Sequence, residues 1–211
     1  MTAVARSPES QQRAEAYWFL ASLFASPPAS DQLARLAGLD VSPAGPAEEI
    51  LATVRGDGSP DELADRLALE HTRLFGGVRE GYGPPPPYES LWREGRMMGE
   101  STIAALRAYG EAGFLPDGRW GPPDHLAEEL RFVAALANGE GEAQGAGRQD
   151  EALWARKRQT DFVERHLMNW VPDYCRALES QAKEPLYQAL ARITVETVAG
   201  DARYLREEDL G

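Results

Sequence analysis

The chain has 211 residues, of which 43% are hydrophobic and 9% aromatic, and this is enough apolar material for one folded core over residues 1–211. Thirty-four acidic residues against 22 basic residues give a net charge of −12, which repels nucleic-acid phosphates and anionic membrane surfaces. The same charge attracts cationic partners, although an acidic exterior that only keeps the protein in solution explains it equally well.

The first predicted element is a helix that starts at Pro8, with Ser7 as a capping hydroxyl and Pro27-Pro28 as a stop. Its apolar residues recur at helical spacing, so we expect one face of the helix to lie in the core. Two short helical patterns follow as connectors, around residues 33–36 and 47–54.

A capping box marks the next helix. Ser59 and Glu62 stand three residues apart, so each side chain can bond the other residue's backbone amide, and the helix is expected to reach Phe75. The segment from Gly76 to Pro87 contains four consecutive prolines. It cannot be helical, and we expect a stiff, extended loop.

Glycines divide the middle of the chain. A helix is expected over residues 95–112, with Gly113 as its carboxyl cap, and another over residues 124–138, ended by Gly139. Residues 139–147 hold four glycines and no large apolar residue. We expect a flexible connection there, which would also serve as a hinge for domain swapping in a homodimer.

The last third of the sequence is again helical in pattern. A helix is expected over residues 150–170, stopped or kinked by Pro172, then a shorter one around Tyr174 and a final one after Pro185. We find no convincing period-two strand. The fold class predicted is therefore all-α, a single-domain helical bundle.

Cysteine content and hydropathy indicate the compartment. The single cysteine, Cys175, cannot form an internal disulfide, and the first residues lack the segments of a secretory signal. The longest aromatic-rich apolar stretch, residues 17–25, is far shorter than the roughly 20 residues that span a bilayer. We expect a cytoplasmic protein without membrane insertion.

Catalytic signatures are absent from the sequence, which has no phosphate-binding loop, dinucleotide-binding turn, nucleophile elbow or close cysteine pair. The alternative to a binding protein is a small helical metal-binding protein or metalloenzyme that uses His125, Glu128 and His166. His125 and Glu128 are three residues apart, but their order is the reverse of the Glu-x-x-His pair of di-metal bundles. His125 is explained equally well as a helix cap or a polar contact.

Three segments carry motifs: residues 70–75 read EHTRLF, residues 87–92 read PYESLW, and residues 123–126 read PDHL. They resemble, in this order, the Glu-x-x-x-Leu-Phe motif, the proline-aromatic-x-x-Leu loop and the Pro-Asp-His helix start of the TorD, DmsD and NarJ chaperones. The resemblance extends over most of residues 10–200. His71, where an aromatic residue is common, and the glycine-rich stretch depart from the family pattern.

The resemblance implies a TorD-like helical chaperone and not an enzyme. Such a chaperone binds the twin-arginine signal peptide and the apo-form of the catalytic subunit of a molybdopterin oxidoreductase. It assists cofactor insertion, delays export until maturation, and retains no cofactor or metal itself. An acidic, aromatic-rich helical chain suits this function, because the signal peptide presents two arginines beside an apolar segment.

The predicted client-binding residues come from two of the motifs. Tyr88, Leu91 and Trp92 adjoin the proline loop, where large apolar groups either pack on the bundle or await a ligand. Asp124 is expected to pair with a signal arginine, and His125 to orient it or to bond peptide backbone.

A second set of motif residues is expected to support the site. Glu70 lies on an apolar stripe and would need a partner if buried, so we expect it to pin the proline loop to the bundle. Leu74 and Phe75 are expected in the core. The remaining supporting residues, from the loop and the helix start, are Pro87, Ser90 and Pro123.

Overall fold

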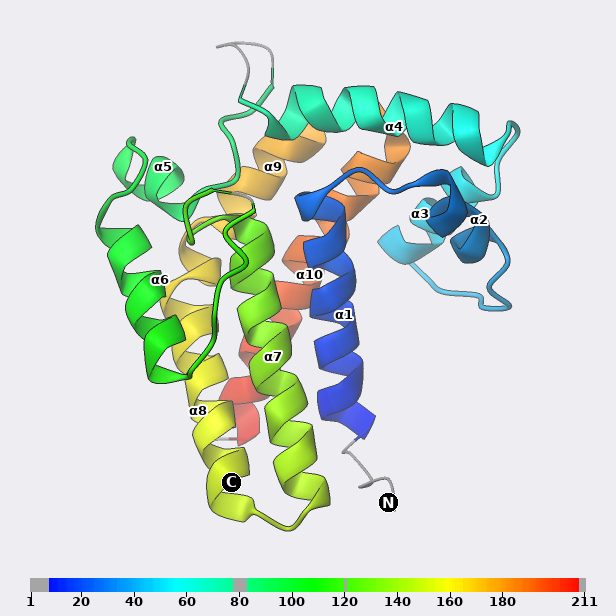
Figure 1. The fold of residues 1–211 in the computed structure, drawn as a ribbon. Helices are drawn as coiled ribbons and strands as arrows, with labels where there is room; N and C mark the ends of the chain where they lie inside the picture. The colour runs from blue at the N-terminus through cyan, green and yellow to red at the C-terminus, as the bar shows by residue number, and fades with distance from the viewer. Residues whose placement is uncertain (1–7, 78–82, 120, 209–211) are drawn as a thin grey trace. The chain divides into compact units, whose positions relative to one another are not determined.

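A computed structural model describes residues 8–77, 83–119 and 121–208, and within these residues it contains ten α-helices, one 3-10 helix and no β-strand (Figure 1). The all-α fold class is confirmed. The helices are α1 Pro8–Ala25, α2 Ser30–Ala37, α3 Pro46–Val54, α4 Pro60–Phe75, α5 Glu89–Glu94, α6 Glu100–Glu111, α7 Leu126–Gly145, α8 Gln149–Arg165, the 3-10 helix η1 Leu167–Asn169, α9 Val171–Gln181 and α10 Pro185–Glu208. No helix in this part of the chain is long and apolar enough to cross a membrane.

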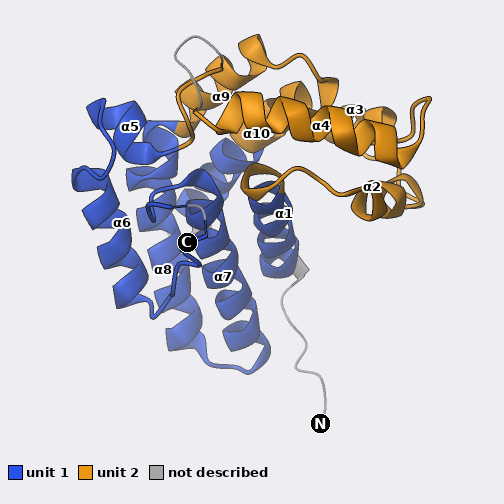
Figure 2. Cartoon of the chain, turned by 45° about the horizontal axis from the view of Figure 1, so that its top comes forward, with its two compact units in different colours: residues 1–22, 88–170, 197–211 blue, residues 23–87, 171–196 orange. Residues whose placement is uncertain are grey.

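The chain forms two compact units, each assembled from separate segments (Figure 2). Unit 1 comprises residues 1–22, 88–170 and 197–211, and unit 2 comprises residues 23–87 and 171–196. Neither unit is continuous in sequence, so the division does not follow one cut along the chain. The organisation as a single domain stays a prediction.

Helices α7 and α8 form the centre of unit 1, where they run side by side in opposite directions (Figure 1). Phe132 of α7 packs against Phe162 of α8 with ring centroids 4.8 Å apart, and Tyr109 of α6 contacts both rings. All three aromatic side chains are buried. The apolar faces of three helices therefore meet in one aromatic core.

Helix α7 continues to Gly145, so the expected end at Gly139 and the flexible connection over residues 139–147 are wrong. Packing outweighs the poor helix propensity of glycine, because Gly141 lies buried and Glu140 bonds two arginines in the core. Only residues 146–148 form the turn to α8.

An ion-pair network in unit 1 joins α1, α7, α8 and α10. Arg13 of α1 bonds Asp201 of α10 and donates to Gln159 of α8 at 2.6 Å. Glu140 of α7 lies 3.3 Å from Arg13 and 2.5 Å from Arg156. The charges are buried but mutually compensated, so the network fixes the positions of the four helices.

The helix expected over residues 95–112 begins later, at Glu100, and a short helix, α5, precedes it. Gly95 ends α5 in the left-handed conformation, at φ 70°, which favours glycine. The Glu94 carboxylate then accepts hydrogen bonds from the amides of Glu100 and Ser101, both at 2.8 Å. A side chain from the end of α5 thus caps α6.

The later helices also differ in their bounds from the prediction. Helix α8 ends at Arg165, and Pro172 lies in the first turn of α9, where a missing amide proton costs nothing, instead of stopping a helix. The predicted cap Ser7 lies outside the described residues.

Unit 2 contains the predicted capping box. The Ser59 hydroxyl accepts a bond from the Glu62 amide at 3.2 Å, and the Glu62 carboxylate accepts one from the Ser59 amide at 3.1 Å, which confirms the start of α4. Farther along this helix, Phe75 packs edge-on against Phe24 and Tyr187. The predicted core position of Phe75 is confirmed, as is that of Leu74.

Candidate functional site

Two of the predicted site residues, Tyr88 and His125, meet in unit 1. They form an isolated antiparallel bridge, and their rings are 5.0 Å apart in an edge-to-face arrangement. The predicted convergence of the proline-loop segment with the start of α7 is therefore confirmed for this pair.

Asp124 joins the start of α5 to the segment before α7 through buried hydrogen bonds. Its Oδ2 accepts a hydrogen bond from the Ser90 amide at 2.8 Å, and its backbone carbonyl accepts one from the Glu89 amide at 2.9 Å. The residue has no exposed surface. Its carboxylate positions the first turn of α5 and, in this structure, does not reach a ligand at the surface.

His125 is the N-cap of α7. Its Nδ1 accepts a hydrogen bond from the Ala127 amide at 3.1 Å, and the side chain is buried. The ring thus satisfies one of the free amides at the helix start while its edge supports Tyr88. Pro123, just before this cap, accepts a hydrogen bond from the Tyr109 hydroxyl through its carbonyl at 2.9 Å.

The accessible part of the site is apolar. Tyr88, Leu91 and Trp92 are half-buried, and the amides of Leu91 and Trp92 both donate to the Tyr88 carbonyl, at 3.1 and 3.2 Å. Tyr88, Leu91 and Trp92 thus stand at the i, i+3 and i+4 positions of one helical turn, a spacing that places side chains on one face. They form a small aromatic and aliphatic patch, which we call the Tyr88 patch, consisting of Tyr88, Leu91 and Trp92.

The supporting motif around Glu70 belongs to unit 2. Glu70 forms a bidentate ion pair with Arg73 at 2.7 and 2.5 Å and accepts a bond from the Lys183 amide at 2.7 Å. Burial favours the neutral acid, but these bonds outweigh it and lower the pKa of Glu70. Glu70 thus fixes the segment between α9 and α10, and the expectation that it pins the proline loop is wrong. Pro87, at the end of that loop, is buried.

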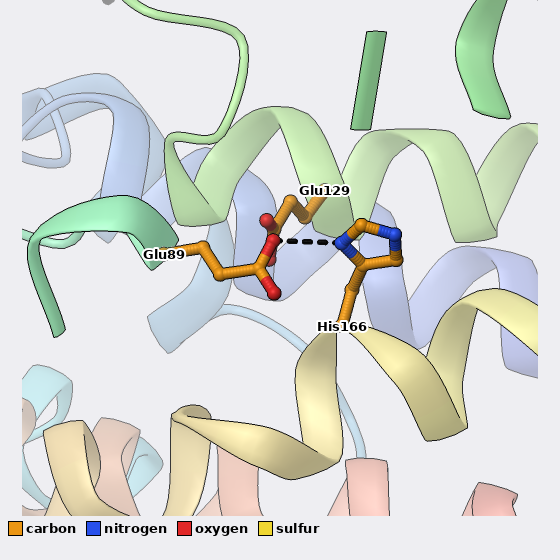
Figure 3. Close-up of side chains that lie close together, drawn as sticks. All are labelled: Glu89, Glu129 and His166. Carbon is orange, nitrogen blue, oxygen red and sulfur yellow. Dashed lines mark hydrogen bonds and ion pairs between the residues drawn. The ribbon is translucent and has the colours of Figure 1, made fainter. Parts of the chain in front are cut away.

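Next to the Tyr88 patch lies a buried acidic cluster that the sequence analysis did not single out. It consists of Glu89, Glu129 and His166, which come from α5, α7 and the end of α8 and point toward one another (Figure 3). His166 Nδ1 is 2.7 Å from Glu89 Oε2, and Arg93 donates to Glu89 Oε1 at 2.5 Å.

The pKa values of the two carboxyl groups in this cluster are shifted in opposite directions. Burial, reinforced by the Glu89 charge, raises the pKa of Glu129 well above its usual value and so favours its neutral form. Burial also acts on Glu89, but the bond to His166, followed by the bond to Arg93, lowers its pKa. The surroundings therefore shift the pKa values of the two carboxyl groups in opposite directions, and the Trp170 indole donates to Glu129 at 3.1 Å.

The cluster is also where a metal ion would find three ligand atoms within 4.8 Å of one another, and no other such group occurs among the described residues. The alternative metal set of His125, Glu128 and His166 is thus not brought together. Glu128 instead bonds Arg131 at 2.9 Å and the Asp117 amide at 2.7 Å. Arg93 already forms an ion pair with Glu89, so the geometry does not require a metal.

Comparison with known proteins supports a chaperone. The sequence profile described as nitrate reductase delta subunit matches residues 40–176. The chaperone protein TorD of Vibrio cholerae is 27% identical over 211 residues, which cover 93% of both chains. The selenate reductase assembly chaperone protein of Thauera selenatis is 43% identical over 58 residues, 28% of this chain and 29% of its own.

A solved structure has the same fold. A redox enzyme maturation protein of Archaeoglobus fulgidus aligns with a TM-score of 0.50 at 23% identity and covers 92% of this chain and 93% of its own. The profile match spans more than half of the present chain, and the relatives are chaperones and not enzymes. The chain therefore belongs to the nitrate reductase delta subunit family, the TorD and NarJ family of redox-enzyme maturation chaperones.

Proposed function

We propose that this protein is a cytoplasmic chaperone for the catalytic subunit of a molybdopterin oxidoreductase. It binds the twin-arginine signal peptide and the apo-form of that subunit, assists cofactor insertion and delays export until maturation is complete. The relatives named as assembly chaperones of selenate reductase and chlorate reductase support a client of this class.

The observation that carries the proposal is the Tyr88 patch. Three large apolar side chains lie half-exposed on one turn, and buried contacts of Asp124 and His125 hold that turn in place. A preformed apolar surface loses little entropy on binding and suits the hydrophobic segment of a signal peptide. The net charge of −12 adds a long-range attraction for the arginines.

Titration calorimetry with a twin-arginine signal peptide from the same organism tests the proposal. We expect binding that weakens from low to high salt, as for a basic peptide on an acidic protein, with an apolar component that survives. The control is the same peptide with its apolar segment replaced by serines, which should lose that component. Absence of binding to every twin-arginine peptide of the organism would refute the proposal.

The oligomeric state is a separate prediction. We expect a monomer with some homodimer, and gel filtration over a range of concentrations measures the proportion. A swapped dimer would have to open the turn at residues 146–148, because the glycines before it belong to α7.

A further inference from the structure

Arg93 connects the buried acidic cluster with the protein surface. Its Nη1 donates to Glu89 Oε1 at 2.5 Å and to the Arg165 carbonyl at 3.3 Å, while 37% of the side chain remains exposed. Glu89 itself has no exposed surface. The buried Glu89 carboxylate is thus bonded to a side chain that is itself partly exposed.

Arg93 lines an open surface cavity of about 760 Å³ along α5 and α6. The cavity wall also carries Arg96, Arg107, Glu94 and Glu100, so its own charges nearly cancel. Ile103 on this wall is 59% exposed. Met97 and Met98, in the segment between α5 and α6, and Leu106 of α6 are also exposed.

Beside the cluster one carboxylate oxygen remains unused. Oδ1 of Asp124 is buried without a hydrogen-bond partner, and the residue has no exposed surface. A guanidinium group carries five N–H donors, and the bonds of Arg93 to Glu89 and to the Arg165 carbonyl both come from Nη1. Arg93 thus holds Glu89 through a single hydrogen bond to Oε1, while Oε2 faces His166.

We propose that Glu89 is the carboxylate of an arginine-binding site, that Arg93 fills this site in the free protein, and that an arginine of a bound basic peptide displaces Arg93. The assignment of that peptide to the client rests on the proposed function. The exchange replaces one guanidinium by another, so no buried charge loses its partner. The exposed side chain of Ile103 on the cavity wall adds an apolar contact to the binding of the peptide.

Guanidinium is the preferred ligand chemistry for a geometric reason. It can donate two parallel bonds to a carboxylate and a third to a neighbouring acceptor, whereas an ammonium group acts as a point charge. With Asp124 engaged by Ser90, Glu89 is the ionised carboxylate beside the Tyr88 patch that an arginine replacing Arg93 would meet.

The first experiment compares three arginine variants by calorimetry with the twin-arginine peptide. Arg93→Gln removes the competing side chain, whereas Arg96→Gln and Arg107→Gln remove the same charge from the same cavity without contacting Glu89. If Arg93 fills the site for about nine-tenths of the time, Arg93→Gln should bind about tenfold more tightly than the wild type. The two control variants should bind the peptide only slightly more tightly than the wild type, because each loses one positive charge that repels the basic peptide.

Two further changes identify the group that is recognised. The tighter peptide binding of Arg93→Gln should disappear when both arginines of the peptide are replaced by lysines. It should also disappear in the double variant Glu89→Gln, Arg93→Gln. Equal affinities of the three single variants would overturn the inference, while leaving the proposed function intact if the wild type binds the peptide.

A second experiment does not depend on the client. Arg93→Ala leaves Glu89 without its guanidinium, and millimolar methylguanidinium, well below denaturing concentrations, should raise the melting temperature of this variant. Methylammonium should not do so, and neither compound should stabilise Arg96→Ala. Failure of methylguanidinium to stabilise Arg93→Ala would refute the arginine site even if no peptide binds any variant.

Discussion

The carboxylate of Asp124 accepts a hydrogen bond from the amide of Ser90 at 2.8 Å, across 34 residues of sequence. This bond joins the start of α5 to the segment that caps α7 and is shielded from water, because both residues are buried. It places the Tyr88 patch on the surface through backbone contacts. Loss of the bond should therefore change stability first and client binding only as a consequence.

The first prediction tests this positioning role. Asp124→Ala removes the acceptor of the Ser90 amide, and because the lost bond involves a charged group we expect a loss of about 1.5–3 kcal/mol in unfolding free energy. Asp124→Asn retains an acceptor oxygen and should cost clearly less, with peptide affinity unchanged. Urea denaturation and calorimetry measure the two effects. Abolished binding in Asp124→Asn at an unchanged melting temperature would instead indicate direct contact with the client.

The second prediction concerns Glu129 and pH. Its pKa in the folded protein lies well above the usual 4.5, so the folded state keeps the proton after the unfolded state has lost it. The free energy of unfolding should therefore fall as pH rises above 4.5. The contribution of Glu129 to this fall is at most about 1.4 kcal/mol per pH unit.

Glu129→Gln mimics the neutral acid and removes this dependence. The stability of the wild type relative to Glu129→Gln should decrease between pH 5 and pH 7.5, as measured by urea denaturation at several pH values. A difference between the two proteins that does not vary with pH would mean that Glu129 is ionised in the folded state throughout.

The third prediction concerns the Tyr88 patch. Trp92→Ala should weaken binding of the signal peptide by about 2 kcal/mol or more, because a large aromatic side chain at the centre of a contact commonly dominates its energy. Trp154 of α8 is 45% exposed and provides a matched control, so Trp154→Ala should leave the affinity unchanged. Calorimetry measures both variants, and the comparison holds where the melting temperature of Trp92→Ala is close to that of the wild type.

The fourth prediction distinguishes helix from linker in the glycine-rich stretch. Gly139 lies in α7, and a Cβ added there meets no atom within 4 Å, so Gly139→Ala should raise the unfolding free energy by about 0.5–1 kcal/mol. Gly147 has φ 72°, which disfavours alanine, and Gly147→Ala should destabilise the protein. Thermal or urea denaturation of the two variants checks the opposite signs. If both substitutions left the unfolding free energy nearly unchanged, residues 139–147 would instead be the flexible connection expected from the sequence.

Local signals made much of the helix pattern predictable. The Ser59 and Glu62 capping box and the Pro27-Pro28 stop each act through backbone hydrogen bonding within a few residues, so the sequence contains the whole cause. Helix α5 is different, because its six residues are too few for a periodic pattern and its start is fixed by Asp124. No local signal predicts it.

The continuation of α7 shows the opposite case, in which tertiary contacts override a local signal. The glycines at residues 139–145 predict a linker, but Glu140 bonds Arg13 and Arg156, which lie far away in sequence or on the next helix. Propensity is a weak effect beside such contacts. The partners of Glu140 could not be found from one sequence.

The site was predictable only in part. The motif resemblance brought Tyr88 and His125 together, but it did not identify the acidic cluster. One signal was present: Glu129 follows Leu126 by three residues and precedes Val133 by four, so it lies on the apolar face of α7. An acid at such a position needs a partner or a proton, and the sequence does not reveal which.

The bonds between Arg13 and Asp201 have a consequence for how the protein is made. The two residues are 188 positions apart, so during translation α1 emerges long before the helix that completes its surroundings. Until then Tyr17, which donates to Asp201 at 2.9 Å in the finished fold, leaves the ribosome with its ring uncovered. Unit 1 combines residues 1–22 with residues 197–211, so it can close only after nearly the whole chain has been synthesised.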